Sequence, residues 1–342
     1  MYKPATIKDI ALALHLSPST VSRGLSDSYG ISEKTKKTIT EYAKKVNYQS
    51  NPIALGLKNR RSYSIGIVVP ELANSFFSQA IAGVESIAYE NGYHIIITQT
   101  HDLSERELIN VNHLAQRSVD GLLISMSSGT TDYSFLKTLH DNGLPIVFFD
   151  RIIDEIETFK VTSDNFSGAY NATESLIRSG TKKIALLANA PQLSITNERL
   201  SGYKKALIDY QIPFKPELVK TCYKGGNDYQ EVEDAVKELL ALPDKPNAIF
   251  ISSDRISISC IRALKELKFD PQEITIVGFS NSDVVDLLQP SISYVRQKAF
   301  EMGQIAVEML LKLIKSKYPI TEFETKILDT ELHWIKDDQK NI

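Results

Sequence analysis

Four side chains in the stretch "SPSTVSR", from Ser17 to Arg23, could bind DNA. Ser19, Thr20 and Ser22 carry hydroxyl groups that can donate hydrogen bonds to phosphate oxygens, and Arg23 can donate two hydrogen bonds to a guanine edge. Small hydroxyl side chains also let a helix lie close within the major groove. The stretch is a candidate recognition helix; the alternative is an ordinary surface helix begun by Ser17 and Pro18.

The neighbouring sequence predicts the helices that would position these residues. Apolar side chains at Ile7, Ile10, Ala11 and Leu14 have helical spacing, and Thr6 with Asp9 forms a capping pair. A short turn leads to the helix that begins at Ser17, and a third helix is expected from Ser32. Three short helices joined in this way predict a helix-turn-helix domain.

The next stretch, "NYQSNPIALGLKNRRS", predicts a short helix at a domain junction. Asn51 and Pro52 have the types found at a helix cap and first position, and the helix could extend only to about Lys58. A helix this short is marginal alone in water, so we expect it to form against a partner helix and DNA. Leu57 could then enter a base step from the minor groove. A flexible linker with apolar residues is the alternative.

Charge is distributed unevenly between this region and the rest of the chain. Residues 1 to 61 hold 11 Lys and Arg against 4 Asp and Glu, a net charge of +7, whereas the other residues hold 28 against 38, a net charge of −10. A basic module on an acidic body is typical of a protein whose small module binds a polyanion.

From Ser64 onward, apolar strands alternate with helical patterns. The strands are "SIGIVV", "GYHIIIT", "VDGLLIS", "LPIVFFD", "KKIALLA", "NAIFIS" and "EITIVGF", and one helix is expected from Phe77 to Asn91. Continuous apolar runs predict parallel strands covered by helices on both faces. The pattern of strand, polar loop and helix occurs twice, which predicts two similar lobes with a ligand cleft at the carboxyl ends of the strands.

A second set of candidate residues lies at those strand ends, namely Phe76, Phe77, Ser125, Asp150, Arg199, Ser253 and Asp254. Aromatic rings can cover the apolar faces of a sugar while Arg and Asp bind its hydroxyl groups. The alternatives are a surface ion pair between Asp150 and Arg151 and a core anchor at Phe76 and Phe77.

Other classes of site find no support in the sequence. It contains no glycine-rich phosphate loop, metal-binding His pair or Gly-x-Ser-x-Gly motif, so no catalytic residue, metal or cofactor is expected. Two cysteines suit a reducing compartment. We find no targeting segment and no apolar run long enough to cross a membrane, which predicts a cytoplasmic protein.

The whole chain resembles the LacI/GalR family of transcriptional regulators. The resemblance rests on "TIKDIALALHLSPSTVSRGL", "NPIALGLKN", "IGIVVPELANSFF", "VDGLLIS", "VFFDR", "DNFSGAYNAT", "ERLSGY" and "IVGFSN", which occur in the family's order. It implies a helix-turn-helix headpiece, an α/β core of two lobes like a periplasmic sugar-binding protein, a pseudo-palindromic operator and a small-molecule effector, most often a carbohydrate. The implied function is a regulator, most often a repressor, whose operator affinity the effector controls.

The resemblance also implies boundaries and site residues. The headpiece would span 1–50 with its motif at about 7–26, the hinge 51–61 and the core 62–340. Within the core, the first lobe would comprise 62–161 and 292–323, and the second 162–291 and 324–340. The implied DNA contacts are Thr6, Ser17, Ser19, Thr20, Ser22, Arg23, Asn51, Leu57 and Lys58, and the effector contacts are Phe76, Phe77, Ser125, Asp150, Arg199, Ser253, Asp254 and Ser280.

Several positions depart from the family's pattern. His15 replaces the usual glycine of the turn, Leu55 replaces a common arginine, and Ser253 and Ser280 stand where Asn and Asp are frequent. No leucine heptad follows Trp334, so a homodimer is expected rather than a tetramer. A sugar carrier without a regulatory role and an enzyme on a doubly wound fold are the competing functions.

Overall fold

The computed structural model describes residues 5–27, 29–48, 61–270, 273–287 and 292–335. The chain divides into two compact units, Met1–Ser62 and Tyr63–Ile342, and each unit is described by itself below. No helix in the described ranges is both long enough and apolar enough to span a membrane.

The N-terminal unit contains the helices α1 (Ile7–Leu14), α2 (Pro18–Leu25) and α3 (Glu33–Lys45). The predicted caps are confirmed: Thr6 and Asp9 form a reciprocal capping box, and the side chains of Ser17 and Ser32 accept backbone hydrogen bonds at the starts of α2 and α3. His15 adopts the left-handed conformation with φ of 54°. Left-handed backbone is uncommon for residues other than glycine, but histidine is among those that adopt it more readily, so the turn forms here without glycine.

The three helices enclose a small core. Its fully buried members are Ile10, Ala11, Val21, Ile39 and Ala43. Leu14, Leu25, Tyr42 and Val46 pack against them and are partly buried. The helical spacing of Ile7, Ile10, Ala11 and Leu14 is confirmed, because Ile10 and Ala11 are buried and Ile7 and Leu14 pack against the same cluster.

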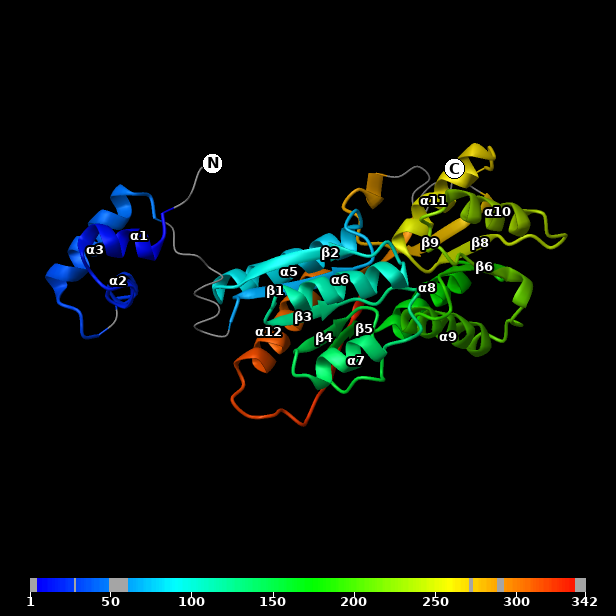
Figure 1. Ribbon diagram of the computed structural model, residues 1–342. Coiled ribbons are helices and arrows are strands. Elements are labelled where there is room, and N and C mark those ends of the chain that lie inside the picture. Colours follow the sequence, from blue (N-terminus) through cyan, green and yellow to red (C-terminus); the bar gives the residue numbers. More distant parts are fainter. Residues whose placement is uncertain (1–4, 28, 49–60, 271–272, 288–291, 336–342) are drawn as a thin grey trace. The chain divides into compact units, whose positions relative to one another are not determined.

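The C-terminal unit contains two six-stranded sheets within its described residues. The first has the strand order β11-β5-β4-β3-β1-β2, and the second has the order β12-β10-β9-β8-β6-β7. Figure 1 labels β1 to β5 of the first sheet and β6, β8 and β9 of the second. The strands are β1 (Ser64–Val69), β2 (His94–Gln99), β3 (Gly121–Ile124), β4 (Ile146–Phe149), β5 (Lys160–Ser163), β6 (Ile184–Ala188), β7 (Val219–Thr221), β8 (Ala248–Ile251), β9 (Thr275–Phe279), β10 (Ser293–Gln297), β11 (Thr325–Leu328) and β12 (Thr330–His333). All pairs are parallel except β10 with β12.

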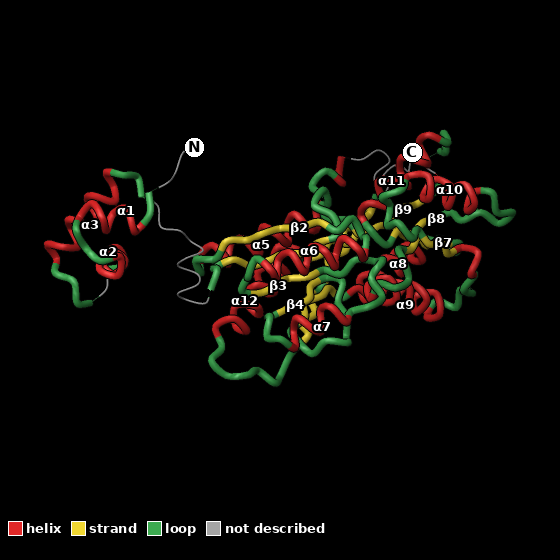
Figure 2. Tube along the Cα trace, in the orientation of Figure 1, coloured by secondary structure: helices red, strands yellow, loops and turns green. Residues whose placement is uncertain are grey.

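Helices cover both faces of each sheet, as Figure 2 shows. They are α5 (Ser75–Glu90), α6 (Ser104–Gln116), α7 (Ser134–Asp141) and α12 (Ala299–Lys315) in the first lobe, and α8 (Asn165–Arg178), α9 (Ser194–Asp209), α10 (Tyr229–Leu240) and α11 (Asp254–Glu266) in the second. Short 3-10 turns occur at η1 (Pro216–Leu218) and η3 (Val285–Leu287). All seven strands expected from apolar runs are present, which confirms the predicted α/β class.

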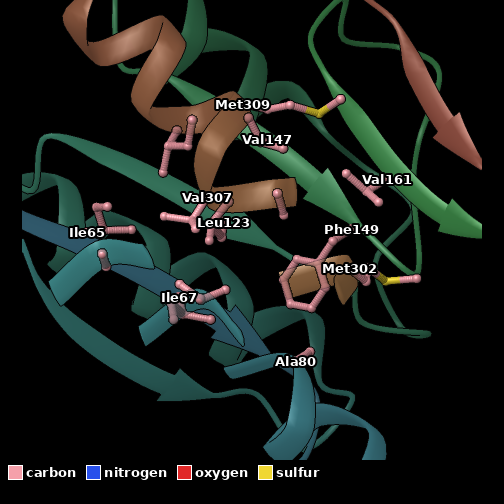
Figure 3. Packing of buried hydrophobic residues seen from close by; sticks show 14 of the residues in the cluster. Ile65, Ile67, Ala80, Leu123, Val147, Phe149, Val161, Met302, Val307 and Met309 are labelled. Carbon is pink, nitrogen blue, oxygen red and sulfur yellow. The ribbon is translucent and has the colours of Figure 1, made fainter. Parts of the chain in front are cut away.

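Alternate side chains of the strands enter separate apolar clusters. In the first lobe Ile65, Ile67 and Leu123 face α5 and α12, where they meet Met302 and Val307 (Figure 3). Their neighbours Val68, Leu122 and Ile124 face α6 and α7. A strand buried on both faces has no polar alternation, which explains its continuous apolar run.

The expected lobe boundaries need correction at three places. β5 extends the first lobe to Ser163 rather than 161. β10 pairs with β9 and β12, so 293–297 belongs to the second sheet, whereas β11 pairs with β5 and belongs to the first. The chain thus crosses between lobes after β5, between β10 and α12, and between β11 and β12. Sheet membership depends on partners distant in sequence, which local patterns do not reveal.

Candidate functional site

Helix α2 presents the candidate DNA-recognition side chains of the N-terminal unit. Ser19 and Arg23 are exposed, while Thr20 and Ser22 are half-buried. The Arg23 Nε donates a long hydrogen bond of 3.4 Å to the Ser19 carbonyl, which leaves the terminal nitrogens of the guanidinium accessible. Val21 on the opposite side of the helix is fully buried. The helix therefore has the polar outer face that contact with a DNA groove requires.

Two further predicted DNA contacts cap helices. The Thr6 hydroxyl accepts from the Asp9 amide at 3.3 Å, and the Ser17 hydroxyl accepts from the Thr20 amide at 3.1 Å. Both residues are exposed at helix N-termini, where backbone amides and a hydroxyl can together approach a phosphate. The remaining predicted contacts, Asn51, Leu57 and Lys58, and the expected hinge helix lie outside the described residues.

The C-terminal unit contains a pocket with an empty volume of about 420 Å³ that is open to solvent. Its lining comes from the loops and helix starts that follow the strands of both lobes. The lining residues are Asn74, Phe76, Phe77, Asp150, Arg151, Asn189, Ile195, Arg199, Ser253, Asp254, Phe279, Ser280, Asn281 and Gln297.

Seven of the eight predicted effector residues line this pocket, namely Phe76, Phe77, Asp150, Arg199, Ser253, Asp254 and Ser280. Ser125 does not. It follows β3 and is fully buried, and its hydroxyl has no hydrogen-bond partner among the described residues. A position directly after a strand brings a residue to the correct edge of the sheet but does not fix the direction of its side chain.

Asp150 is held in an unusual backbone conformation at the end of β4. Its φ is 59°, and its amide donates to the Val161 carbonyl at 2.9 Å while its carbonyl accepts from the Thr162 hydroxyl at 3.1 Å. Non-glycine residues in this region cluster at functional sites, where surrounding contacts maintain the strain. Burial raises the pKa of the Asp150 carboxyl, and the cations of Arg151 and Arg199 oppose that rise.

Arg199 is buried beneath the pocket with partners on three sides. Its Nε donates to Asn165 Oδ1 at 2.9 Å, and its Nη1 donates to the Ser252 carbonyl. The guanidinium also lies over the Phe279 ring. Burial lowers the pKa of Arg199 to about 10, which keeps the side chain positively charged at neutral pH. The arginine is thus fixed in position, as a ligand-binding side chain should be.

Arg151 lines the pocket on the first lobe. Its Nη1 forms an ion pair of 2.5 Å with Asp102 and donates to the Met126 carbonyl at 3.3 Å. Its Nε is buried without a partner among the described residues. An unsatisfied buried donor beside a pocket is a candidate for a ligand hydrogen bond.

Ser280 positions Asp254 on the second lobe. The Ser280 hydroxyl donates to Asp254 Oδ1, and the Ser282 amide donates to the Ser280 oxygen at 3.2 Å. Burial raises the pKa of Asp254, while the Ser280 hydrogen bond opposes the rise. Ser280, which stands where Asp is frequent, thus contributes a hydroxyl that orients the carboxyl group of Asp254.

Sequence analysis missed seven lining residues, namely Asn74, Arg151, Asn189, Ile195, Phe279, Asn281 and Gln297. Asn189 directly follows β6 and Gln297 ends β10, so the rule that ligands bind at carboxyl ends could have identified Asn189. Gln297 required recognition of β10, which the sequence analysis did not predict. Asn281 forms hydrogen bonds with Gln79 of the first lobe at 2.9 and 3.0 Å, a contact that only the tertiary structure reveals.

Two family models match the two units. The model described as bacterial regulatory proteins, lacI family, matches residues 6–51, and the model described as periplasmic binding protein domain matches residues 65–318.

No group of three or more His, Cys, Asp or Glu suited to a metal ion occurs in the parts of the chain that the structure describes.

Relatives extend over nearly the full chain. The "Ribose operon repressor" of Haemophilus influenzae is 30% identical and aligns over 95% of this chain and 96% of the repressor. The "Probable HTH-type transcriptional repressor ExuR" of Bacillus subtilis is 32% identical over 98% of this chain and 99% of its own length.

A solved structure agrees with these relatives. A LacI family transcriptional regulator from Enterococcus faecium with bound ribose is 27% identical, has a TM-score of 0.68, and covers 79% of this chain and 97% of its own. With the helix-turn-helix unit, the two-lobed unit and the near full-length relatives, the chain belongs to the lacI family of bacterial regulatory proteins.

Proposed function

We propose that this chain is a transcriptional regulator, acting as a repressor, whose affinity for a specific operator is controlled by a carbohydrate bound between the lobes. The observation that carries the proposal is the composition of the pocket, in which aromatic rings stand beside fixed carboxylate, guanidinium and amide groups. Such groups match the apolar faces and the hydroxyl groups of a sugar. The exposed polar face of α2 supplies the DNA-binding half of the function.

The charges around the pocket favour an uncharged sugar over a sugar acid or phosphate. Its lining holds two carboxyl groups, Asp150 and Asp254, and two guanidinium groups, Arg151 and Arg199. Arg151 is already paired with Asp102. Because the two carboxyl groups balance the two guanidinium groups, an anionic ligand would find no excess of positive charge in the lining, and its desolvation would be poorly compensated.

The DNA contacts are proposed from α2 and the adjoining caps. Ser19, Ser22 and Arg23 would contact the major groove, with Thr6, Ser17 and Thr20 near the phosphates. Leu57 would enter the minor groove, as the resemblance to the family implies, and Asn51 and Lys58 would be further DNA contacts of the same segment. A symmetric homodimer would place two such headpieces on a pseudo-palindromic operator.

Selection of operator sequences by the full chain from a random pool of duplexes tests both halves of this proposal. The selected duplex is then titrated with the protein in the presence of D-ribose, D-glucose, D-galactose or D-glucuronate. We expect a recurrent inverted-repeat sequence and a change in affinity of at least about tenfold with one uncharged sugar. Failure of every duplex to be enriched would contradict the DNA-binding half.

A further inference from the structure

Two charged residues outside the pocket lining face each other between the lobes. Glu71 lies in the loop after β1 of the first lobe, and Arg255 lies in the first turn of α11 of the second lobe. The Arg255 Nη2 is 3.5 Å from Glu71 Oε2. The side chain of Glu71 is only 16% exposed and that of Arg255 is 33% exposed, so the pair is partly shielded from water.

Each partner is fixed on its own lobe by further hydrogen bonds. Glu71 Oε1 accepts from Gln99 Nε2 at 2.8 Å and from the Ala73 amide at 3.3 Å. Its Oε2 faces Arg255 of the other lobe and also lies 3.7 Å from His101 Nδ1 of its own lobe. Arg255 Nη1 donates to Asn227 Oδ1 at 2.5 Å. Because both side chains are already ordered, their ion pair loses less side-chain entropy than an ordinary surface pair.

The pair lies beside the pocket. In the order of the strands it is also far from two of the three places where the chain crosses between the lobes. Arg255 directly follows the lining residues Ser253 and Asp254, and Glu71 precedes the lining residue Asn74. Glu71 is held by Gln99 of β2, the edge strand opposite β11 and β5, which lead into two of the crossings. The bridge between Gln79 and Asn281, in contrast, adjoins Gln297 at the third crossing. A contact far from a hinge opposes lobe separation more effectively than one at the hinge.

We propose that Glu71 and Arg255 form a latch that holds the two lobes together at the mouth of the pocket. Opening of the cleft must break this pair, so the latch raises the fraction of closed molecules and slows escape of a bound ligand. Its role in ligand release rests on the proposed function, whereas its effect on lobe separation does not depend on any ligand.

The latch can be tested on the full chain without an added ligand by electron spin resonance distance measurements. Spin labels are placed at Glu105→Cys and Gln192→Cys, exposed positions on the first and second lobes that follow β2 and β6. The native Cys222 and Cys260 are buried, which limits their labelling. Labelled chains are diluted with unlabelled chains so that only distances within one chain are measured. All variants are measured at the same pH.

We expect Glu71→Gln and Arg255→Gln each to raise the population of longer distances about two- to fivefold, and the double variant to add little to either. The control is Glu273→Gln, which removes an ion pair of 3.0 Å with Lys245 within the second lobe and should leave the distances unchanged. Unchanged distances in both latch variants, or equal changes in the control, would overturn the latch.

A sugar measurement on the same variants separates the latch from the proposed function. If D-ribose binds the native chain, we expect it to dissociate about two- to fivefold faster from both latch variants. Lack of binding by every sugar in the panel, with the distance changes present, would contradict the proposed function and leave the latch intact. Sugar binding with unchanged distances would contradict only the latch.

Discussion

The guanidinium carbon of Arg199 lies 3.6 Å from the centroid of the Phe279 ring, at the base of the pocket. Both residues line the pocket. The guanidinium of Arg199 is also held by hydrogen bonds to Asn165 and to the Ser252 carbonyl. Cation–π contact in a desolvated site is worth about 2 kcal/mol. The pair joins α9 to β9 in the lining of the pocket.

Arg199→Ala should weaken sugar binding while sparing operator affinity in the absence of sugar. A charge-assisted hydrogen bond to a buried ligand is worth about 1.5 to 3 kcal/mol, which corresponds to a loss of affinity of about ten- to a hundredfold. Calorimetry with the sugar found to act on the native chain measures the loss. Arg178→Ala is the control, because Arg178 is an exposed arginine of the second lobe that pairs with Glu174. Unchanged binding in Arg199→Ala would assign the residue a purely structural role.

Leu57→Ala should weaken binding to the operator but leave binding to random DNA nearly unchanged. An apolar wedge offsets the cost of unstacking a base step, whereas binding to random DNA depends on neutralisation of phosphates. Loss of the leucine should cost about 1.5 to 3 kcal/mol per site, and twice that if both leucines of a dimer insert. Affinities for both duplexes across a salt series measure the effect, with parallel salt dependences expected for the two proteins. An equal loss on both duplexes, or no loss on either, would reduce residues 51–61 to a tether.

Gly303→Ala should destabilise the first lobe because α12 and α5 are in backbone contact there. A Cβ atom at residue 303 would lie 1.9 Å from the Ala80 carbonyl oxygen, and one at Gly83 would lie 2.0 Å from the Phe300 carbonyl oxygen. Neither backbone oxygen can move aside, so the helices must separate, at a cost of about 1 to 3 kcal/mol or more. Thermal unfolding measures the change, with Glu301→Ala on the exposed side of α12 as the control. Equal melting temperatures for the two variants would show that the helices separate without penalty.

The difference in free energy of unfolding between Glu107→Gln and the native chain should shift in favour of the variant as the pH rises. Glu107 is fully buried on α6, where its carboxyl accepts from the Ser127 amide at 2.7 Å and the Thr130 hydroxyl at 2.8 Å. Burial raises the pKa of Glu107 above its ordinary value of 4.5, so the folded state binds a proton more tightly than the unfolded state. The free energy of unfolding of the native chain must therefore fall as the pH rises from that value through the raised pKa.

Urea unfolding of the native chain and Glu107→Gln at about pH 5 and about pH 8 tests this linkage. Glu105→Gln is the matched control, since Glu105 is exposed on the same helix. If the stability of Glu107→Gln follows the native chain in parallel across this range, the carboxyl at residue 107 does not account for the pH dependence.

The sequence predicted the strands with continuous apolar runs and missed the strands that carry polar residues. "SIGIVV" and "EITIVGF" are apolar because helices cover both their faces, and they became β1 and β9. The edge strand β11 has the burial of a surface strand, with only Leu328 fully covered, and its polar residues gave no strand pattern. Residues after the apolar strands were therefore easier to place at the pocket than Gln297, which ends the unpredicted strand β10, "SYVRQ".

Side-chain direction set a second limit on prediction of the site. Asp150 reaches the pocket because its left-handed backbone turns the chain after β4, whereas Ser125, at the matching position after β3, is buried away from the pocket lining. The backbone conformation responsible depends on contacts with Val161 and Thr162 of β5. Such contacts join segments that are distant in sequence and leave no local pattern.

The most direct test measures the affinity of the full chain for its selected operator, with and without the sugar that binds the pocket. The native chain and Arg199→Ala are compared. We expect the sugar to change the operator affinity of the native chain by at least about tenfold, in either direction, and to change that of Arg199→Ala little. Without sugar, both proteins should bind the operator with equal affinity. A native chain that binds the sugar and the operator independently, with the same operator affinity at every sugar concentration, would contradict this expectation.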